Sequence, residues 1–201
     1  MKKILSVILA GLTFFTIHNT KAEEIDMTGK KVLVVYFSKT GEQYSVGNIT
    51  EGNTAIIAKM IAEQTKADLF EVKLKNDTYP VAYKALTEVA LSEKKANARP
   101  QIDGDVTNFA DYNIVFLGSP NWWGDLPMAL YTFMEAHDWN GKAVIPFVTH
   151  EGSGLSSIPS KIKATTKAEV LDGLAVYGHV AQNDREQAEE NVTNWLNKLG
   201  F

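Results

Sequence analysis

The sequence predicts an α/β fold in three layers: a doubly wound, five-stranded parallel sheet with helices on both faces. Apolar runs such as KVLVVYF (31–37) and NIVFLGSP (113–120) lack polar alternation, which is typical of strands buried on both faces. Segments with apolar residues at helical spacing separate these runs, as in AIIAKMIAE (55–63). Strands and helices that alternate in this way predict parallel strands joined by crossover helices.

The first strand, 31–37, is followed by a helix at 53–67, in which Asn53 or Thr54 is placed to cap the start. Further strands are expected at 68–73, 113–120, 142–150 and 168–178. Further helices are expected at 81–98, 126–137, 154–166 and 184–200.

Four prolines mark helix boundaries. Pro80 precedes the second helix and Pro100 follows it, because the residue before a proline avoids helical geometry. Pro127 fits the first turn of the third helix, and Pro159 limits the fourth, which is therefore the weakest of the set.

The first 22 residues have the three-part layout of a secretory signal peptide. Lys2 and Lys3 precede a mainly apolar stretch at 4–17, and Ala22 offers a small-residue exit. The stretch is shorter than the ~20 residues that cross a bilayer, so we expect export, to a periplasm, with an uncleaved anchor as the alternative. The expected organisation is a signal peptide at 1–22, a polar lead-in at 23–30 and one domain at 31–201.

Composition narrows the possible partners. Without residues 1–22 the chain carries 17 basic and 24 acidic side chains, a net charge of −7. An acidic surface argues against nucleic acid or an anionic membrane as a partner, and we expect no stable membrane insertion after signal cleavage. The chain has no cysteine, which excludes disulfides and a cysteine-linked lipid anchor.

The connection after the first strand, SKTGEQYSVGNITEGNT (38–54), is long and rich in small polar residues. Ligands of doubly wound sheets bind beyond the carboxyl ends of the strands, and the amides of a helix N-terminus attract anions. Neither G-x-x-x-x-G-K-[ST] nor G-x-G-x-x-G is present, so the segment predicts a phosphate that is held rather than transferred. An ordinary polar connection is the alternative, and we expect Lys39 to be an exposed strand-end lysine. The candidate phosphate ligands are Ser38, Thr40, Gly41, Asn53 and Thr54.

The connection after the third strand, GSPNWWGDLP (118–127), holds two adjacent tryptophans. Neighbouring side chains point in different directions, so at most one of Trp122 and Trp123 serves the core. The other exposes a large apolar face unless a flat ligand covers it. This position in the fold favours a ring-binding role over packing of the loop on its neighbours.

The connection after the fourth strand, THEGSGL (149–155), offers amides around Ser153 and a carboxylate on Glu151. Such a mixture of donors and acceptors suits a ring with carbonyl oxygens and an imide N–H. His150 and Ser153 do not have the G-x-S-x-G spacing of a hydrolase, and H-E-x-x-H is absent. We therefore expect His150 to orient the loop, and no metal site. Together the three loops specify a phosphate at one end and a flat heteroaromatic ring at the other, which is the shape of flavin mononucleotide (FMN).

Several stretches resemble the flavodoxin family, in order along nearly the whole mature chain. They are VLVVYFSKTG, GNTAIIAKMIAE, YPVAY, FLGSPNWWGDLPMALYTFME, GKAVIPFVTHEGSGL and GLAVYG. The resemblance is closer to a bacterial branch of flavodoxin-like proteins with an enlarged phosphate loop. It implies a strand order of 2-1-3-4-5 and an FMN cofactor.

The resemblance also implies roles for individual residues. Those that hold the phosphate would be Ser38, Thr40, Gly41, Asn53 and Thr54. Those that border the isoalloxazine would be Pro120, Asn121, Trp122, Trp123 and Gly124, with Trp122 favoured to stack on the ring. Those that border its pyrimidine side would be Thr149, Glu151, Gly152 and Ser153.

Two details of the resemblance stay open. The insertion at 42–52 separates the two halves of the phosphate cradle. Three roles are open for it: to contact the cofactor, to fold over it, or to face solvent. Gly124 is flexible enough for its carbonyl to turn toward the ring N5–H.

The functions that fit are redox functions carried by the flavin rather than by a catalytic side chain. The leading hypothesis is an exported electron carrier whose partner is a redox protein or a small electron donor or acceptor. An oxidoreductase that takes hydride from NAD(P)H and reduces a quinone is the alternative, and the sequence does not decide between carrier and enzyme. A binding module that has lost the flavin is a third possibility.

Overall fold

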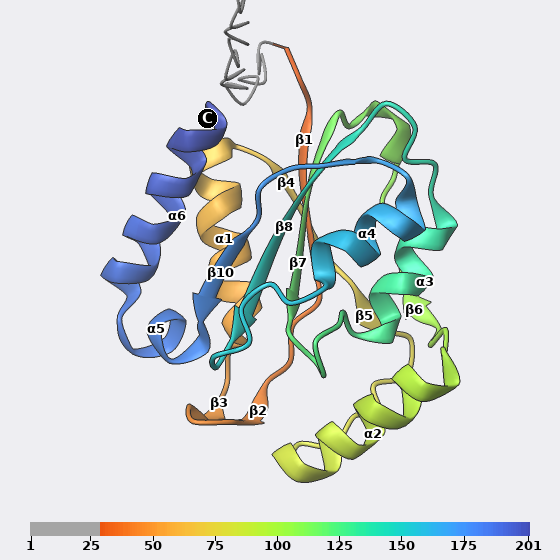
Figure 1. Ribbon diagram of the computed structural model, residues 1–201, viewed down its shortest axis with the longest axis vertical. Coiled ribbons are helices and arrows are strands. Elements are labelled where there is room, and N and C mark those ends of the chain that lie inside the picture. Colours follow the sequence, from red (N-terminus) through yellow and green to blue (C-terminus); the bar gives the residue numbers. More distant parts are fainter. Residues whose placement is uncertain (1–28) are drawn as a thin grey trace, which may run out of the picture.

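The computed structural model describes residues 29–201, so the expected signal peptide and most of the expected polar lead-in lie outside the described part of the chain. Its centre is a parallel sheet (Figure 1). The main strands, in spatial order, are β4 (Asp68–Glu71), β1 (Val32–Tyr36), β7 (Ile114–Pro120), β8 (Ala143–His150) and β10 (Leu174–Tyr177). In chain order these are the second, first, third, fourth and fifth main strands, which confirms the order 2-1-3-4-5.

The fifth position of the sheet is divided between two strands. The short β9 (Glu169–Val170) and β10 both pair with β8, so six segments fill the five expected positions. The break lies opposite Pro146 of β8, which has no N–H to donate to a neighbouring strand. Gly173 passes close to this point, and a Cβ on it would lie 2.7 Å from the Pro146 carbonyl oxygen.

Helices cover both faces of the sheet, as expected (Figure 1). One face carries α1 (Asn53–Thr65), α5 (Gly178–Asn183) and α6 (Arg185–Leu199). The other carries α2 (Tyr83–Ala96), α3 (Met128–Ala136) and α4 (Ile158–Thr166). Side chains along β1 alternate between the two layers: Val34 and Tyr36 pack under α1 and α6, whereas Leu33 and Val35 pack on the opposite side.

The expected helices are confirmed with small shifts of their ends. Helix α4 begins at Ile158 rather than at 154 and has Pro159 in its first turn, where a missing N–H is tolerated. Helix α5 and the short 3₁₀ helix η1 (Phe109–Asp111) were not predicted from the sequence. No helix within residues 29–201 combines the length and the apolar character that a membrane span requires.

Two small antiparallel hairpins add to the doubly wound core. The strands β2 (Gly41–Gln43) and β3 (Gly47–Ile49) form one of them within the insertion at 42–52. The strands β5 (Lys73–Leu74) and β6 (Ile102–Asp103) flank α2 and form the other. In Figure 1 the β2–β3 hairpin and α2 lie at the lower end of the sheet, where β1, β7 and β8 end. This end is therefore where a ligand site is expected.

Candidate functional site

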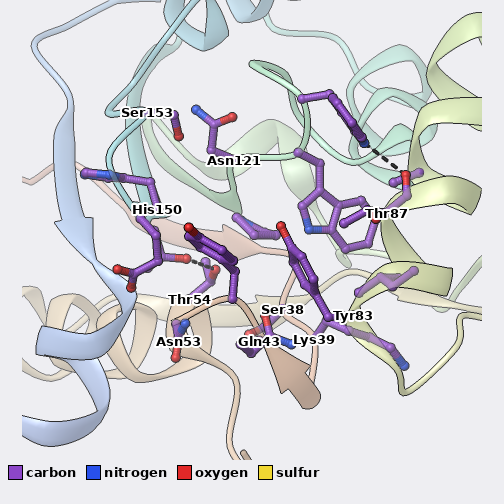
Figure 2. Close-up of a pocket in the computed structure, with 18 residues that line it drawn as sticks. Ser38, Lys39, Gln43, Asn53, Thr54, Tyr83, Thr87, Asn121, His150 and Ser153 are labelled. Carbon is purple, nitrogen blue, oxygen red and sulfur yellow. Dashed lines mark hydrogen bonds between the residues drawn. The ribbon is translucent and has the colours of Figure 1, made fainter. Parts of the chain in front are cut away.

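A cavity of about 500 Å³ lies at the carboxyl ends of β1, β7 and β8 (Figure 2). What we call the inner wall comes from the loop after β1, the start of α1, the end of β8 and the loop that follows it: Ser38, Lys39, Asn53, Thr54, Thr149, His150, Glu151 and Ser153. What we call the outer wall comes from the β2–β3 hairpin and α2: Gln43, Tyr44, Tyr83, Leu86, Thr87 and Ala90. The end of β7 and the loop after it join the two walls through Pro120, Asn121, Trp122 and Trp123. The volume is within the range of roughly 300–1,000 Å³ that is usual for small-molecule sites.

The first loop is locked onto the start of α1. The Ser38 hydroxyl accepts a hydrogen bond from the amide of Ala55 (3.1 Å). The position before the helix is Gly52, and neither Asn53 nor Thr54 caps the helix with its own side chain, so the expected cap is wrong. A Cβ on Gly52 would lie 2.1 Å from the Ser38 hydroxyl, so only glycine allows this contact.

The start of α1 presents donors to the cavity. Asn53 and Thr54 are the first two residues of the helix, and among the described residues neither amide has a carbonyl partner. Lys39 also lines the cavity, where its side chain is only 12% exposed and its ammonium pairs with Asp77 (2.8 Å), which offsets part of its positive charge. The expectation of an exposed Lys39 is therefore wrong.

The fourth strand is tied to the same helix. The hydroxyls of Thr54 and Thr149 share a buried hydrogen bond of 2.8 Å, which joins the first and third loops. The side chain of Asn53 accepts a hydrogen bond from Gln182 of α5 (2.8 Å). Thr54 is therefore held in place by β8, and Asn53 by α5, in addition to the backbone of α1 itself.

Asn121 connects the second and third loops. Its backbone amide donates to the Thr149 carbonyl, and its side-chain amide donates to the Gly154 carbonyl and the Ser156 hydroxyl, all at 2.9 Å. Its side-chain oxygen accepts from the amide of Gly124 (2.9 Å). With the Thr54–Thr149 hydrogen bond, these contacts bring three loops that are far apart in the sequence together at the carboxyl end of the sheet.

The two tryptophans have different environments. The Trp122 ring packs edge-on against Phe37 and Tyr79, with ring centroids 5.4 Å apart in each pair. Trp123 is 51% exposed, and its indole N–H donates to the Thr87 carbonyl of α2 (2.9 Å). Trp123 is the more exposed of the two rings, although both line the cavity, so stacking by Trp122 stays a prediction.

The turn that carries Trp123 has an unusual backbone. Trp122 and Asp125 exchange two backbone hydrogen bonds across it, and Trp123 and Gly124 have φ values of +58° and +72°. Glycine adopts this region readily, but a bulky side chain there costs about 1–2 kcal/mol. Such strain is kept where surrounding contacts impose it, often at functional sites.

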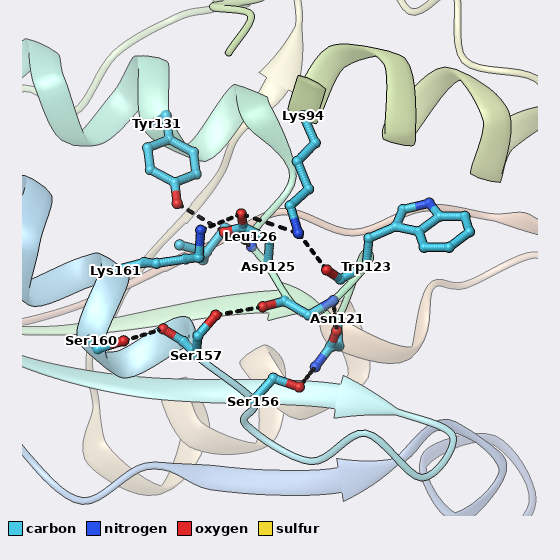
Figure 3. Close-up of polar contacts among 11 residues, drawn as sticks. Lys94, Asn121, Trp123, Asp125, Leu126, Tyr131, Ser156, Ser157, Ser160 and Lys161 are labelled. Carbon is cyan, nitrogen blue, oxygen red and sulfur yellow. Dashed lines mark hydrogen bonds and ion pairs between the residues drawn. The ribbon is translucent and has the colours of Figure 1, made fainter. Parts of the chain in front are cut away.

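Those contacts converge on Asp125, whose side chain is only 3% exposed (Figure 3). Its carboxylate accepts from the Tyr131 hydroxyl (2.8 Å) and from Lys161 (2.7 Å), with Lys94 of α2 at 3.7 Å. Lys94 also donates to the Trp123 carbonyl. This network fixes the tryptophan turn to α2, α3 and α4.

The Gly124 carbonyl belongs to the same network. It accepts a hydrogen bond from the Ser157 hydroxyl (2.8 Å) at the start of α4. In this conformation the carbonyl is bonded to α4, and its turn toward the ring N5–H stays a prediction. Gly124 itself does not line the cavity.

The third loop is shaped by histidine and glutamate side chains. His150 Nδ1 accepts from the amide of Gly152 (2.8 Å), which confirms the expected loop-orienting role. Burial lowers the pKa of His150, and nearby His179 lowers it further, while Glu151 opposes the shift. Both Glu151 oxygens bond to His179 at 2.8 Å, one to its amide and the other to its ring. Glu151 therefore anchors α5, and because it also lines the cavity its contact with a ligand stays a prediction.

The outer wall is held by fewer contacts. The Glu42 side chain accepts from the amide of Tyr83 (2.9 Å), and the Glu42 amide donates to the Val81 carbonyl (3.0 Å). The rings of Tyr44 and Tyr83 lie 5.7 Å apart, so the hairpin and α2 meet at the mouth of the cavity. The insertion thus contributes to the site, a point that the sequence left open.

The predicted site residues are largely brought together. Ten of the fourteen line the cavity, and the four that do not are Thr40, Gly41, Gly124 and Gly152. Of the outer wall, the sequence left the role of the insertion at 42–52 open, and no binding role was predicted for the helix at 81–98. In residues 29–201 there is no group of three or more acidic or histidine side chains arranged to hold a metal.

Comparisons with known proteins agree with this arrangement. No curated protein matches the chain by sequence. A structure from Bacteroides eggerthii assigned as a flavoprotein is 26% identical, with a TM-score of 0.65 over 85% of this chain and 98% of that one. A second such structure, from Bacteroides uniformis, is 27% identical, with a TM-score of 0.63 over 82% and 99%. A flavoprotein from Lactobacillus acidophilus in complex with FMN is 22% identical, with a TM-score of 0.58 over 78% and 97%, and shows the same fold.

The sequence profile of the flavodoxin family matches residues 31–199, which is nearly the whole described chain. With the strand order 2-1-3-4-5 and a site at the carboxyl ends of the first, third and fourth main strands, the chain belongs to the flavodoxin family.

Proposed function

We propose that this protein binds FMN and acts as an exported electron carrier. The observation that carries the proposal is a single cavity with two chemically different ends. One end presents the hydroxyls of Ser38 and Thr54 and the free amides at the start of α1. The other presents the exposed face of Trp123 and the ring of Tyr83.

The residues fit the two parts of FMN. Free amides at a helix start, hydroxyls and the Lys39 ammonium suit a phosphate dianion. The close contact between Gly52 and Ser38 leaves no room for a side chain, which keeps the helix start open to an anion. Trp123 and Tyr83 suit a planar ring, because aromatic faces stack on flat heterocycles.

The bound flavin would supply the electron-transfer chemistry, and the protein would hold and tune it. The Asn121 hydrogen bonds fix the distance between the loops after β7 and β8. The Thr54–Thr149 hydrogen bond fixes the loop after β8 relative to the helix start. Leu86 and Ala90 of α2 add an apolar wall that excludes water from one side of the site.

Export and the carrier role have separate support. The layout of residues 1–22 supports export. The net charge of −7 that remains without those residues would favour a basic redox partner through electrostatic steering. No second nucleotide-binding fingerprint is present in the sequence, which favours a carrier over an NAD(P)H-dependent enzyme.

The visible spectrum of the purified protein, recorded with and without added FMN, tests cofactor binding. We expect a yellow protein with a flavin spectrum that remains after gel filtration. A protein that stays colourless after incubation with FMN would contradict the proposal and favour a binding module without flavin.

Stopped-flow mixing of the loaded protein with NADPH separates carrier from enzyme. We expect the flavin absorbance to stay unchanged over seconds, because a carrier receives electrons from a redox partner. Rapid bleaching would replace the carrier with an NAD(P)H-dependent oxidoreductase.

A further inference from the structure

The Gln43 side chain has no hydrogen-bond partner for its buried amide nitrogen. Gln43 lies on β2 of the hairpin formed by the insertion, and it lines the cavity (Figure 2). Its Nε2 atom is inaccessible to water, and no acceptor for it is found in the described part of the chain. A buried donor without a partner costs about 1–3 kcal/mol. A half-turn of the amide, which exchanges Nε2 with Oε1, turns the donor toward the cavity, where a ligand can supply the acceptor.

The hairpin backbone directs this amide inward. Successive side chains of a strand point to opposite sides, and Glu42, next to Gln43, does not line the cavity and accepts from the amide of Tyr83. Gly41 fixes the start of the hairpin, since a Cβ there would lie 2.9 Å from the Val81 carbonyl oxygen. The Tyr44–Tyr83 contact holds the hairpin at its tip. Gln43 is thus positioned by contacts on both sides of it in the sequence.

We infer that Gln43 donates a hydrogen bond to an oxygen of the polyol-phosphate tail of the cofactor, and that the insertion is a clamp which holds that tail. The inference rests on the proposed binding of FMN. The tail is the part concerned because Gln43 shares the cavity with Ser38 and Lys39, which belong to the same segment after β1. The flat ring is accounted for by the tryptophan turn at the other end.

The test compares the dissociation constants of FMN for the wild type, Gln43→Ala and Gln43→Glu by flavin fluorescence quenching. We expect Gln43→Ala to weaken FMN binding about tenfold or more, as for loss of a hydrogen bond to a charged group. Gln43→Glu should weaken it further, because a carboxylate repels the phosphate. Asn48→Ala is the matched control, since Asn48 faces Glu42 across the hairpin, is exposed and does not line the cavity.

Riboflavin, which lacks the phosphate, identifies the oxygen that Gln43 contacts. If Gln43→Ala weakens FMN but not riboflavin, the acceptor is the phosphate; if it weakens both equally, the acceptor is a ribityl hydroxyl. Thermal unfolding without FMN should give Gln43→Ala a midpoint equal to or above that of the wild type, because the variant no longer buries an unpaired donor; this shows that the variant folds. Equal FMN affinity of the wild type and Gln43→Ala would overturn the inference while leaving FMN binding intact, whereas a wild type that binds no FMN would defeat the proposed function itself.

Discussion

The two walls of the cavity are built in different ways. Six residues of α1 in the inner wall are buried, and among them Ile57 and Ile61 are fully enclosed beneath the sheet. Helix α2 in the outer wall is one residue longer than α1, yet only Leu86 and Ala90 are buried. It is attached to the tryptophan turn through Lys94 and Thr87 and to the hairpin through Tyr83.

This difference predicts that the stability of the fold and the affinity for a ligand depend on different walls. The inner wall is positioned by the hydrophobic core. The residues that begin α1 lie in the same helix as the residues that pack α1 against β1 and β7. The outer wall has few core contacts, so it can vary in position without unfolding the sheet. We therefore expect changes in the inner layer to act on stability, and changes in the outer wall to act mainly on ligand affinity.

The largest expected effect is the loss of stability when Ile57 is replaced. Replacing this fully buried side chain with alanine should lower the free energy of unfolding by about 2–5 kcal/mol, because a cavity is left in the core. Leu86→Ala should cost about 1–2 kcal/mol, because the removed atoms border space that already exists, and it should weaken FMN binding. Denaturant unfolding without FMN and FMN titration measure the two effects. Equal stability losses for both variants would erase the distinction between the walls.

A smaller effect is expected for Lys94. The Lys94→Met variant removes the donor to the Trp123 carbonyl and one of two cations near Asp125. It should lower stability by about 0.5–1.5 kcal/mol and leave the strained Trp123 turn less restrained. Acrylamide quenching of tryptophan fluorescence should therefore increase. Lys95→Met is the control, because Lys95 is exposed and makes no such contact; a similar rise in quenching there would refute the role of Lys94.

The smallest effect concerns pH and the inner wall. Burial lowers the pKa of folded His150 below its ordinary value of 6.5, so its contribution to stability is complete above about pH 6.5. As the pH falls below that value, the unfolded chain takes up a proton first, and stability declines until folded His150 is also protonated. The Gly152 amide then loses its acceptor.

The free energy of unfolding, measured from about pH 7.5 to about pH 5.5, should fall more steeply for the wild type than for His150→Asn. Asparagine offers an oxygen to the Gly152 amide but does not titrate. Parallel pH profiles for the two proteins would show that another group is responsible.

The sequence was sufficient for the parts of the molecule that are set by local pattern. The run at 31–37 and the spacing of Ile57 and Ile61 specify a strand and a helix by burial, and both were predicted. The strand order came from the family resemblance. The rim formed by the three loops followed from a rule about the carboxyl ends of parallel strands.

The remaining features depend on contacts between distant segments. Ser38 replaces Asn53 or Thr54 in bonding the first turn of α1, because the close approach of Gly52 brings its hydroxyl there. The different roles of Trp122 and Trp123 depend on Tyr79 and Thr87, which lie far from them in the chain. No local pattern carries this information. The division of the fifth strand is an intermediate case, since Pro146 was visible in the sequence but its neighbours were not.

The most direct test of the account is a titration of FMN with the purified protein, followed by flavin fluorescence. If the aromatic end of the cavity receives the ring and the start of α1 receives the phosphate, fluorescence will be quenched to saturation at one FMN per chain, and Trp123→Ala will reduce the quenching. If the emission of FMN stays that of the free cofactor at excess protein, the cavity is not a flavin site.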